Sequence, residues 1–119
     1  MDDFAKVLAE RHRIIADVVA DLASGKFEEV ARRSNSRHLS ASEIGQAIRS
    51  YGRELIPLPP EALSLVDFVS VRGSNPPEWS VIVPLFTKEE GRSDLSLELG
   101  LRRLAPHAYT FEIQGIHVL

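Results

Sequence analysis

A strict alternation of leucines is the feature that most constrains the fold of this chain. Between Asp94 and Arg102 every second residue is a leucine, and serine, glutamate and glycine stand between them. Successive side chains of a strand point to opposite faces, so this pattern predicts a strand with one apolar face. Such a face is not stable in water, and other parts of the chain must cover it.

The first half of the sequence supplies helices that can form this cover. Residues 3–24 are predicted to form one long helix, with Asp2 or Asp3 at its start and Gly25 at its end. Its apolar residues recur at helical spacing: Phe4, Val7, Leu8, Ile15, Val18, Val19 and Leu22. Residues 26–33 repeat this pattern over a shorter length.

A third helix is predicted by a motif at its first turn. Ser40 and Glu43 stand at the spacing of a capping box, in which each side chain accepts a hydrogen bond from a backbone N–H of the other residue. Leu39 and Ile44 flank this motif as a hydrophobic staple, and Gly52 ends the helix.

From Leu65 onward the apolar residues recur with period two, which is typical of strands. The pattern predicts strands over residues 65–72, 79–87 and 94–102, and a last strand from residue 109. A polar hairpin loop is expected over residues 88–93. Pro84 lacks an N–H donor and Gly115 marks a phase slip, so we expect a β-bulge or unpaired backbone at each.

Together these elements predict an α+β fold, with three N-terminal helices packed on one face of a bent four-stranded antiparallel meander. The length of 119 residues suits a single domain over residues 1–119. Its expected parts are a helical part (3–52), a Pro-rich connector (53–63) and an antiparallel sheet (64–119). The connector is expected to be extended, with a turn of helix at residues 61–63, because its prolines exclude regular helix and central strand.

Composition excludes several classes of function. The chain has no cysteine, which rules out disulfides, thiol nucleophiles and zinc–thiolate sites. A net charge of −3 and a pI of about 5.8 argue against a nucleic-acid-binding protein, and the basic cluster Arg32, Arg33, Arg37 and His38 is interpreted as a solvated helix end. The N-terminus does not resemble a secretory signal, and no stretch is apolar enough to span a membrane, so we expect a cytoplasmic, bacterial protein.

The element order resembles the cone-shaped nuclear-transport-factor-two-like superfamily, which includes ketosteroid isomerase and limonene epoxide hydrolase, and shares its layout with cystatin-like folds. The resemblance covers most of the chain and includes the segment from Ser24 to Val30. Three other segments resemble a small bacterial domain family of unknown function: residues 79–87, 89–95 and 116–119. That second resemblance implies no activity.

Enzymes of the first superfamily place carboxylate, Tyr or His side chains inside an apolar cone, where burial shifts their pKa values. The resemblance implies that such side chains would lie in the same place in this chain. The candidates in this sequence are Asp67, Tyr51 and His117. Asp67 points inward if Leu65 and Val69 do, and outward if Val66 and Phe68 point inward; the pattern permits both. Tyr51 fits a core residue and His117 a terminal surface imidazole.

No cofactor or metal is expected. The four histidines do not form a pair at metal-binding spacing, and adjacent acidic residues such as Asp2–Asp3 do not face one site. Serines are frequent, but none lies in a nucleophile elbow, and no Gly-rich phosphate loop is present.

The second face of the predicted sheet is mixed in character and is where we expect a partner. Trp79 is assigned to the core. The candidate partner-binding residues are Ile82, Phe86, Glu89, Glu90, Arg92 and Asp94, an apolar centre with a polar border. The sequence therefore favours a non-enzymatic protein-binding module that forms a homodimer or captures a partner, as small acidic immunity proteins do. The alternative is a small-molecule-binding protein or enzyme with a pocket between the helices and the concave sheet face.

Overall fold

The computed structural model describes residues 3–34 and 39–118. Three helices come first, as predicted: α1 (Asp3–Ala23), α2 (Phe27–Arg33) and α3 (Ala41–Tyr51). The predicted cap residue Asp2 lies outside the described residues. The positive φ angles of Gly25 and Gly52, 77° and 78°, end α1 and α3 in the left-handed conformation that glycine adopts without a steric penalty.

The capping box of α3 is confirmed. The Glu43 backbone N–H donates to Ser40 Oγ over 3.1 Å, and the Ser40 backbone N–H donates to Glu43 Oε1 over 2.9 Å. These two bonds satisfy backbone donors that an uncapped helix start leaves free. They also lower the pKa of the Glu43 carboxyl, because both the backbone and the side chain of Ser40 stabilise its charged form.

The second half forms an antiparallel sheet in which β3 is central to the pairing. Its elements are β1 (Leu55–Ile56), the 3-10 helix η1 (Pro60–Leu65), β2 (Asp67–Ser70), β3 (Glu78–Thr87), β4 (Gly91–Ala105) and β5 (Ala108–Val118). The strands from β2 to β5 form the predicted meander. β1 adds a fifth strand, because it pairs with the end of β3 on the edge that β2 occupies further along.

Three element boundaries differ from the predictions. The strand predicted over residues 65–72 is only β2, because Leu65 belongs to η1 and the chain turns after Ser70. The hairpin loop predicted over 88–93 is confined to residues 88–90, since Gly91 already pairs with Thr87. β4 continues past Arg102 to Ala105, so the β4–β5 turn is tighter than expected.

Both expected irregularities of the sheet are present. The pairing register of β3 and β4 shifts between Pro84 and Phe86, and that of β4 and β5 shifts opposite residues 98 and 99, next to Gly115. Bulges increase strand bending and twist, which is how this sheet curls around α1. After the second bulge Ile116 is buried, as expected, whereas Val118 is 57% exposed because the strand ends there.

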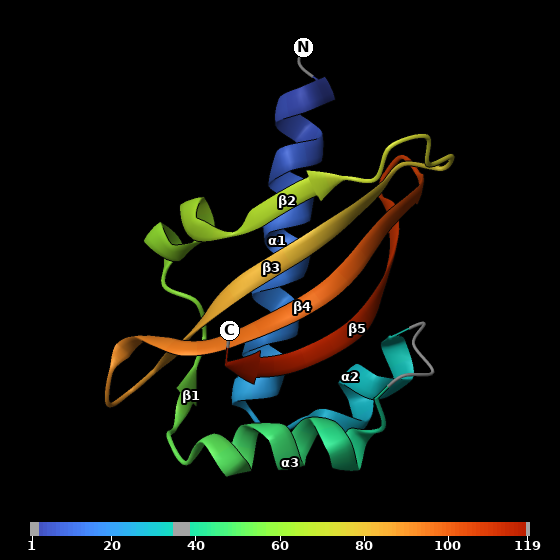
Figure 1. The fold of residues 1–119 in the computed structure, drawn as a ribbon. Helices are drawn as coiled ribbons and strands as arrows, with labels where there is room; N and C mark the ends of the chain where they lie inside the picture. Colours follow the sequence, from blue (N-terminus) through green and yellow to red (C-terminus); the bar gives the residue numbers. More distant parts are fainter. Residues whose placement is uncertain (1–2, 35–38, 119) are drawn as a thin grey trace.

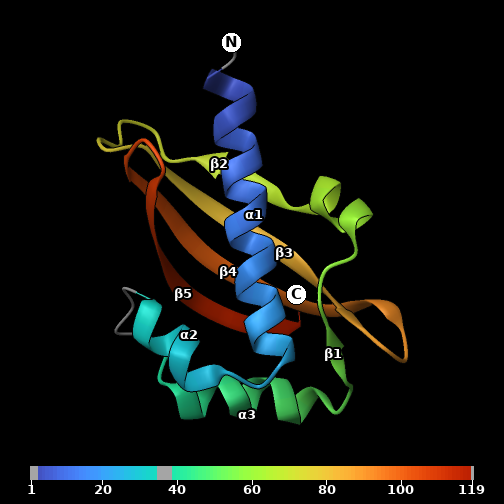
Figure 2. The ribbon, with the colours of Figure 1, turned by 180° about the vertical axis from the view of Figure 1, so that it is seen from behind.

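The α+β fold is confirmed, with the helices on the concave face of a curled sheet. Figure 2 shows α1 lying across that face, and α2 and α3 closing the end next to β5. The core includes all four alternating leucines of β4, at most 3% exposed, and the inward residues of β3, Val81, Val83 and Leu85. Ile15, Val18, Val19 and Leu22 of α1 complete it from the other side. No helix within residues 3–34 and 39–118 lies over the opposite, convex face of the sheet (Figure 1).

Candidate functional site

We call the convex side of the sheet the outer face. Its side chains come from the positions that alternate with the core residues, so the same alternation that builds the core builds this surface. Its apolar centre is on β3: Ile82 and Phe86 are half-buried and Pro84 is buried. Around them lie polar and charged residues: Asp67, Glu78, Ser80, Ser96, Glu98, Arg102, Thr110, Glu112 and His117.

Carboxylates outnumber cations on the outer face. Arg102 lies 3.2 Å from a Glu78 oxygen, and His117 Nε2 lies 3.1 Å from Glu98 Oε1. Asp67 is exposed, and its side chain has no hydrogen bond or ion pair with the described residues. Four carboxylates, from Asp67, Glu78, Glu98 and Glu112, share this face with one arginine and one histidine, so the face is acidic.

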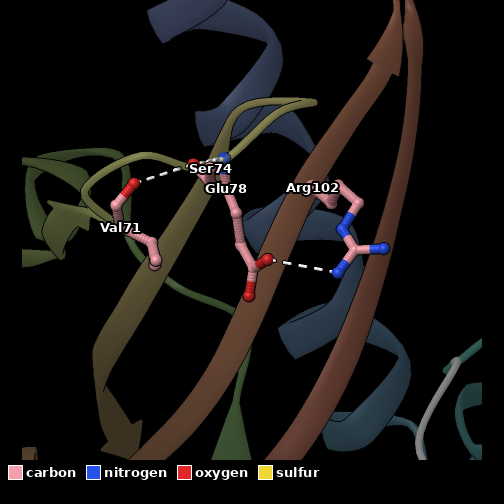
Figure 3. Close-up of polar contacts among 4 residues, drawn as sticks. All are labelled: Val71, Ser74, Glu78 and Arg102. Atoms are coloured by element: carbon pink, nitrogen blue, oxygen red, sulfur yellow. Dashed lines mark hydrogen bonds and ion pairs between the residues drawn. The ribbon is translucent and has the colours of Figure 1, made fainter.

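The start of β3 is held in place by the preceding loop. Ser74 Oγ donates to the Val71 carbonyl over 2.8 Å and accepts the Glu78 backbone N–H over 3.0 Å (Figure 3). Glu78 in turn meets Arg102 of β4, as the dashed line in Figure 3 shows. These contacts fix one acidic corner of the outer face.

A shallow hollow of about 30 Å³ lies in this corner. It is open because Gly100, in the middle of β4, has no side chain; a Cβ there would lie 3.2 Å from Gln114 Nε2. Glycine in a strand interior weakens the strand and often marks a place where another group approaches closely. The other lining residues are Glu78, Arg102, Thr110, Phe111 and Glu112.

The hairpin residues predicted to bind a partner divide into two groups. Glu89 accepts the Glu54 backbone N–H over 2.9 Å, which lowers the pKa of its carboxyl, and Glu90 accepts the Tyr51 hydroxyl over 3.0 Å. These two carboxylates therefore fasten the hairpin to β1 and α3. Arg92 and Asp94 are exposed, and their side chains have no hydrogen bond or ion pair with other described residues.

The three pocket candidates do not meet in one place. Asp67 is exposed on β2 opposite Ile82, with Val66 and Phe68 on the inward side. Tyr51 and His117 both line an open hollow of about 320 Å³ between α3 and the end of β5. The Tyr51 hydroxyl also accepts the Asp94 backbone N–H over 3.2 Å.

Sequence reasoning missed a polar cluster between α1 and the β4–β5 turn, which we call the Glu10 cluster. Glu10, only 9% exposed, accepts the Tyr109 hydroxyl over 2.8 Å and also contacts His107 Nδ1. The Tyr109 bond lowers the pKa of Glu10, and burial raises the pKa of Tyr109 to about 12. One feature of the sequence could have indicated this cluster: Glu10 and Arg11 interrupt the apolar stripe of α1.

His107 holds an uncommon backbone conformation in this cluster. Its φ of 66° makes it the one non-glycine residue with positive φ in the part of the chain that the structure describes. The conformation costs energy for residues with a Cβ, and the contact with Glu10 stabilises it here. The Glu10 cluster thus fastens the β4–β5 turn to α1.

Comparison with known proteins identifies the family. Residues 19–119 match a family model described as Domain of unknown function (DUF7668). The chain belongs to this family. The predicted membership of an uncharacterised domain family is therefore confirmed, and the DUF7668 match covers the entire sheet. No curated protein and no solved structure matches the chain.

Two further observations concern the described residues only. No helix among them is both long enough and apolar enough to cross a membrane. No group of three or more His, Asp or Glu side chains within residues 3–34 and 39–118 is arranged to hold a metal ion. In the basic cluster, Arg33 pairs with Asp21 over 2.6 Å, while Arg37 and His38 lie outside the described residues.

Proposed function

We propose that this DUF7668 domain is a non-enzymatic protein-binding module whose outer face receives a basic surface of a partner protein. The observation that carries the proposal is the uncovered sheet face in Figure 1, with its half-buried Ile82 and Phe86 bordered by an excess of carboxylates. An apolar centre with a polar border is the usual anatomy of a protein interface. A cytoplasmic, bacterial setting is part of this proposal.

The size of the face supports a modest interface. Three strands, β3 to β5, at about 4.8 Å spacing and about 33 Å length, together with the four-residue β2, give roughly 540 Å², and the hairpin adds to it. A specific complex buries about 800 Å² on each partner. The exposed hairpin side chains, Arg92 and Asp94, extend the surface on the side of Phe86.

Charge favours a different protein over a second copy of this chain. Two copies docked through their outer faces would place carboxylates against carboxylates, and like charges across an interface oppose association. A basic partner instead pairs with the unpaired Asp67 and gains from long-range attraction.

The experiment is a paired capture from the native host with the intact protein as bait. Asp67→Lys reverses one exposed charge on the outer face, and Asp17→Lys reverses an exposed charge on α1 as the matched control. We expect one basic protein to bind wild type and the control, and to bind Asp67→Lys at least about tenfold more weakly, with affinity falling as salt rises. Equal binding to all three baits would refute the outer-face assignment.

Light scattering on wild type and Phe86→Arg separates capture of a partner from self-association. We expect both to be monomers. A wild-type dimer that Phe86→Arg converts to monomer would replace the basic partner with a second copy on the same face. A dimer unchanged by Phe86→Arg would place self-association elsewhere and count against the proposal.

A further inference from the structure

Arg11 is a buried cation that the fold and the proposed function leave unexplained. It is only 7% exposed, and its guanidinium carbon lies 4.5 Å from the ring centroid of Phe68 and 4.7 Å from that of Trp79. Its side chain forms no hydrogen bond or ion pair with the described residues, and its Nε is buried without a partner. The guanidinium thus lies against two aromatic rings, and no described residue accepts a hydrogen bond from it.

Burying the Arg11 guanidinium in this way is unfavourable unless a group outside the chain supplies a negative charge or hydrogen-bond acceptors. Removing a charge from water costs free energy unless an opposite charge or hydrogen-bond acceptors compensate. The rings compensate in part through cation–π attraction. The preceding residue Glu10 is not the counter-ion, because Tyr109 and His107 occupy its carboxylate. Burial accordingly lowers the pKa of Arg11.

Part of the guanidinium remains reachable from outside. Arg11 Nε is fully buried, whereas the two terminal nitrogens are unbonded and are not among the fully buried atoms. The Phe68 and Trp79 rings both lie against the guanidinium carbon, so the terminal nitrogens are the part of the group left for a ligand. A guanidinium edge carries parallel N–H donors that match the two oxygens of a carboxylate.

The surface next to this edge is apolar. Helix side chains lean toward the helix N-terminus, and residues three and four positions earlier share their face. On α1 these are Leu8 and Val7, both half-buried, and one further step along the stripe is Phe4, which is 72% exposed. Figures 1 and 2 show that the first turns of α1 extend past the sheet, which agrees with the rise in exposure from Leu8 to Phe4.

We propose that Arg11 binds the carboxylate of an apolar monocarboxylate, whose apolar part lies along Phe4, Val7 and Leu8. The ligand is either a free apolar acid or the C-terminal carboxylate of an apolar peptide. The charge nearby suits a monoanion: Arg11 and Arg103 carry two positive charges and Glu10 one negative charge. Burial lowers the pKa of the neighbouring His12, which adds no charge at neutral pH.

The experiment uses the fluorescence of Trp79, the only tryptophan of the chain, whose ring centroid lies 4.7 Å from the Arg11 guanidinium carbon. The intact protein is titrated at constant ionic strength with sodium octanoate, N-acetyl-Leu-Val and its C-terminal amide, and sodium phosphate. We expect a saturable change with octanoate, with the acid peptide or with both, and none with the amide or phosphate. Octanoate alone would identify a free acid as ligand, and the peptide alone a chain terminus.

Two variants of α1 assign the response to Arg11. Arg11→Met should abolish the saturable change, whereas Arg13→Met, which removes an exposed arginine of the same helix, should leave it unchanged. If Arg11→Met does not fold, Arg11→Lys is used instead, because lysine keeps the positive charge but lacks the parallel N–H donors of the guanidinium. The affinity of Arg11→Lys for the acid should fall at least about tenfold. The proposal is overturned if wild type shows no saturable change up to about 10 mM acid, or if amide or phosphate binds as well as the acids.

Discussion

Replacing Leu97 by alanine tests whether the alternating leucines form the core on which both proposals depend. Leu97 is fully buried in the middle of β4, opposite Val83 of β3 and Ile116 of β5. Removing its three outer carbons from a closely packed site costs about 3–4 kcal/mol, from lost transfer free energy and from the cavity left behind. That is a large share of the 5–15 kcal/mol by which a domain is usually stable.

The expected loss of about 3–4 kcal/mol can be converted into a change in melting temperature. With an unfolding entropy of about 2.1 cal/mol/K per residue, the 119 residues of this chain give about 0.25 kcal/mol/K. A loss of 3–4 kcal/mol therefore lowers Tm by about 12–16 °C. Urea unfolding followed by circular dichroism gives the free energy, and an unchanged m-value shows that the change lies in stability.

Leu104→Ala is the matched control, because Leu104 lies on the same strand but is 55% exposed. Leu104→Ala should lower the free energy of unfolding by less than about 1 kcal/mol, and Tm by less than about 4 °C. Similar losses for the two variants, or a loss below about 0.5 kcal/mol for Leu97→Ala, would refute the assignment of the leucine side to the core.

Three other predictions concern single polar contacts. Ser40→Ala removes one half of the α3 capping box and should cost about 1 kcal/mol in urea unfolding. Tyr51→Phe removes the hydroxyl that joins Glu90 and the β4 backbone to α3, and it should speed amide exchange in the β3–β4 hairpin without changing the exchange of α1. The raised pKa of Tyr109 means that its contribution to stability is complete below pH 10 and is lost as pH rises through about 12; absorbance titration should show this late ionisation in wild type, and Glu10→Gln should move it to lower pH. The lowered pKa of Glu10 acts in the opposite direction, so its contribution is present above the ordinary carboxyl pKa and is lost as pH falls through the lowered one.

Features set by neighbouring residues were predictable from the sequence. The helix boundaries, the capping box at Ser40, the leucine face and the bulge next to Gly115 depend on spacings of a few residues. Periodicity reports which face is buried, and it reported both faces of β3 and β4 correctly.

Features that depend on distant pairing were not predictable. β1 has two residues and exists only because β3 lies beside it. Leu65 fits the period of a strand but enters η1, where its side chain is 42% exposed. The Glu10 cluster joins residues 97 and 99 positions apart, and no local pattern in the sequence records that contact.

The two proposed binding surfaces differ in their relation to the family. All outer-face residues lie within residues 19–119, which match the DUF7668 model, whereas Arg11 and the apolar stripe before it precede that match. The division falls within α1: Val19 and Leu22 lie in the core and inside the match, whereas Phe4 is exposed and precedes the match. We therefore expect some DUF7668 domains to have the acidic outer face but no arginine packed against two aromatic rings. Such a domain should capture a basic partner and show no response to octanoate, and the opposite result would show that one of the two surfaces is wrongly assigned.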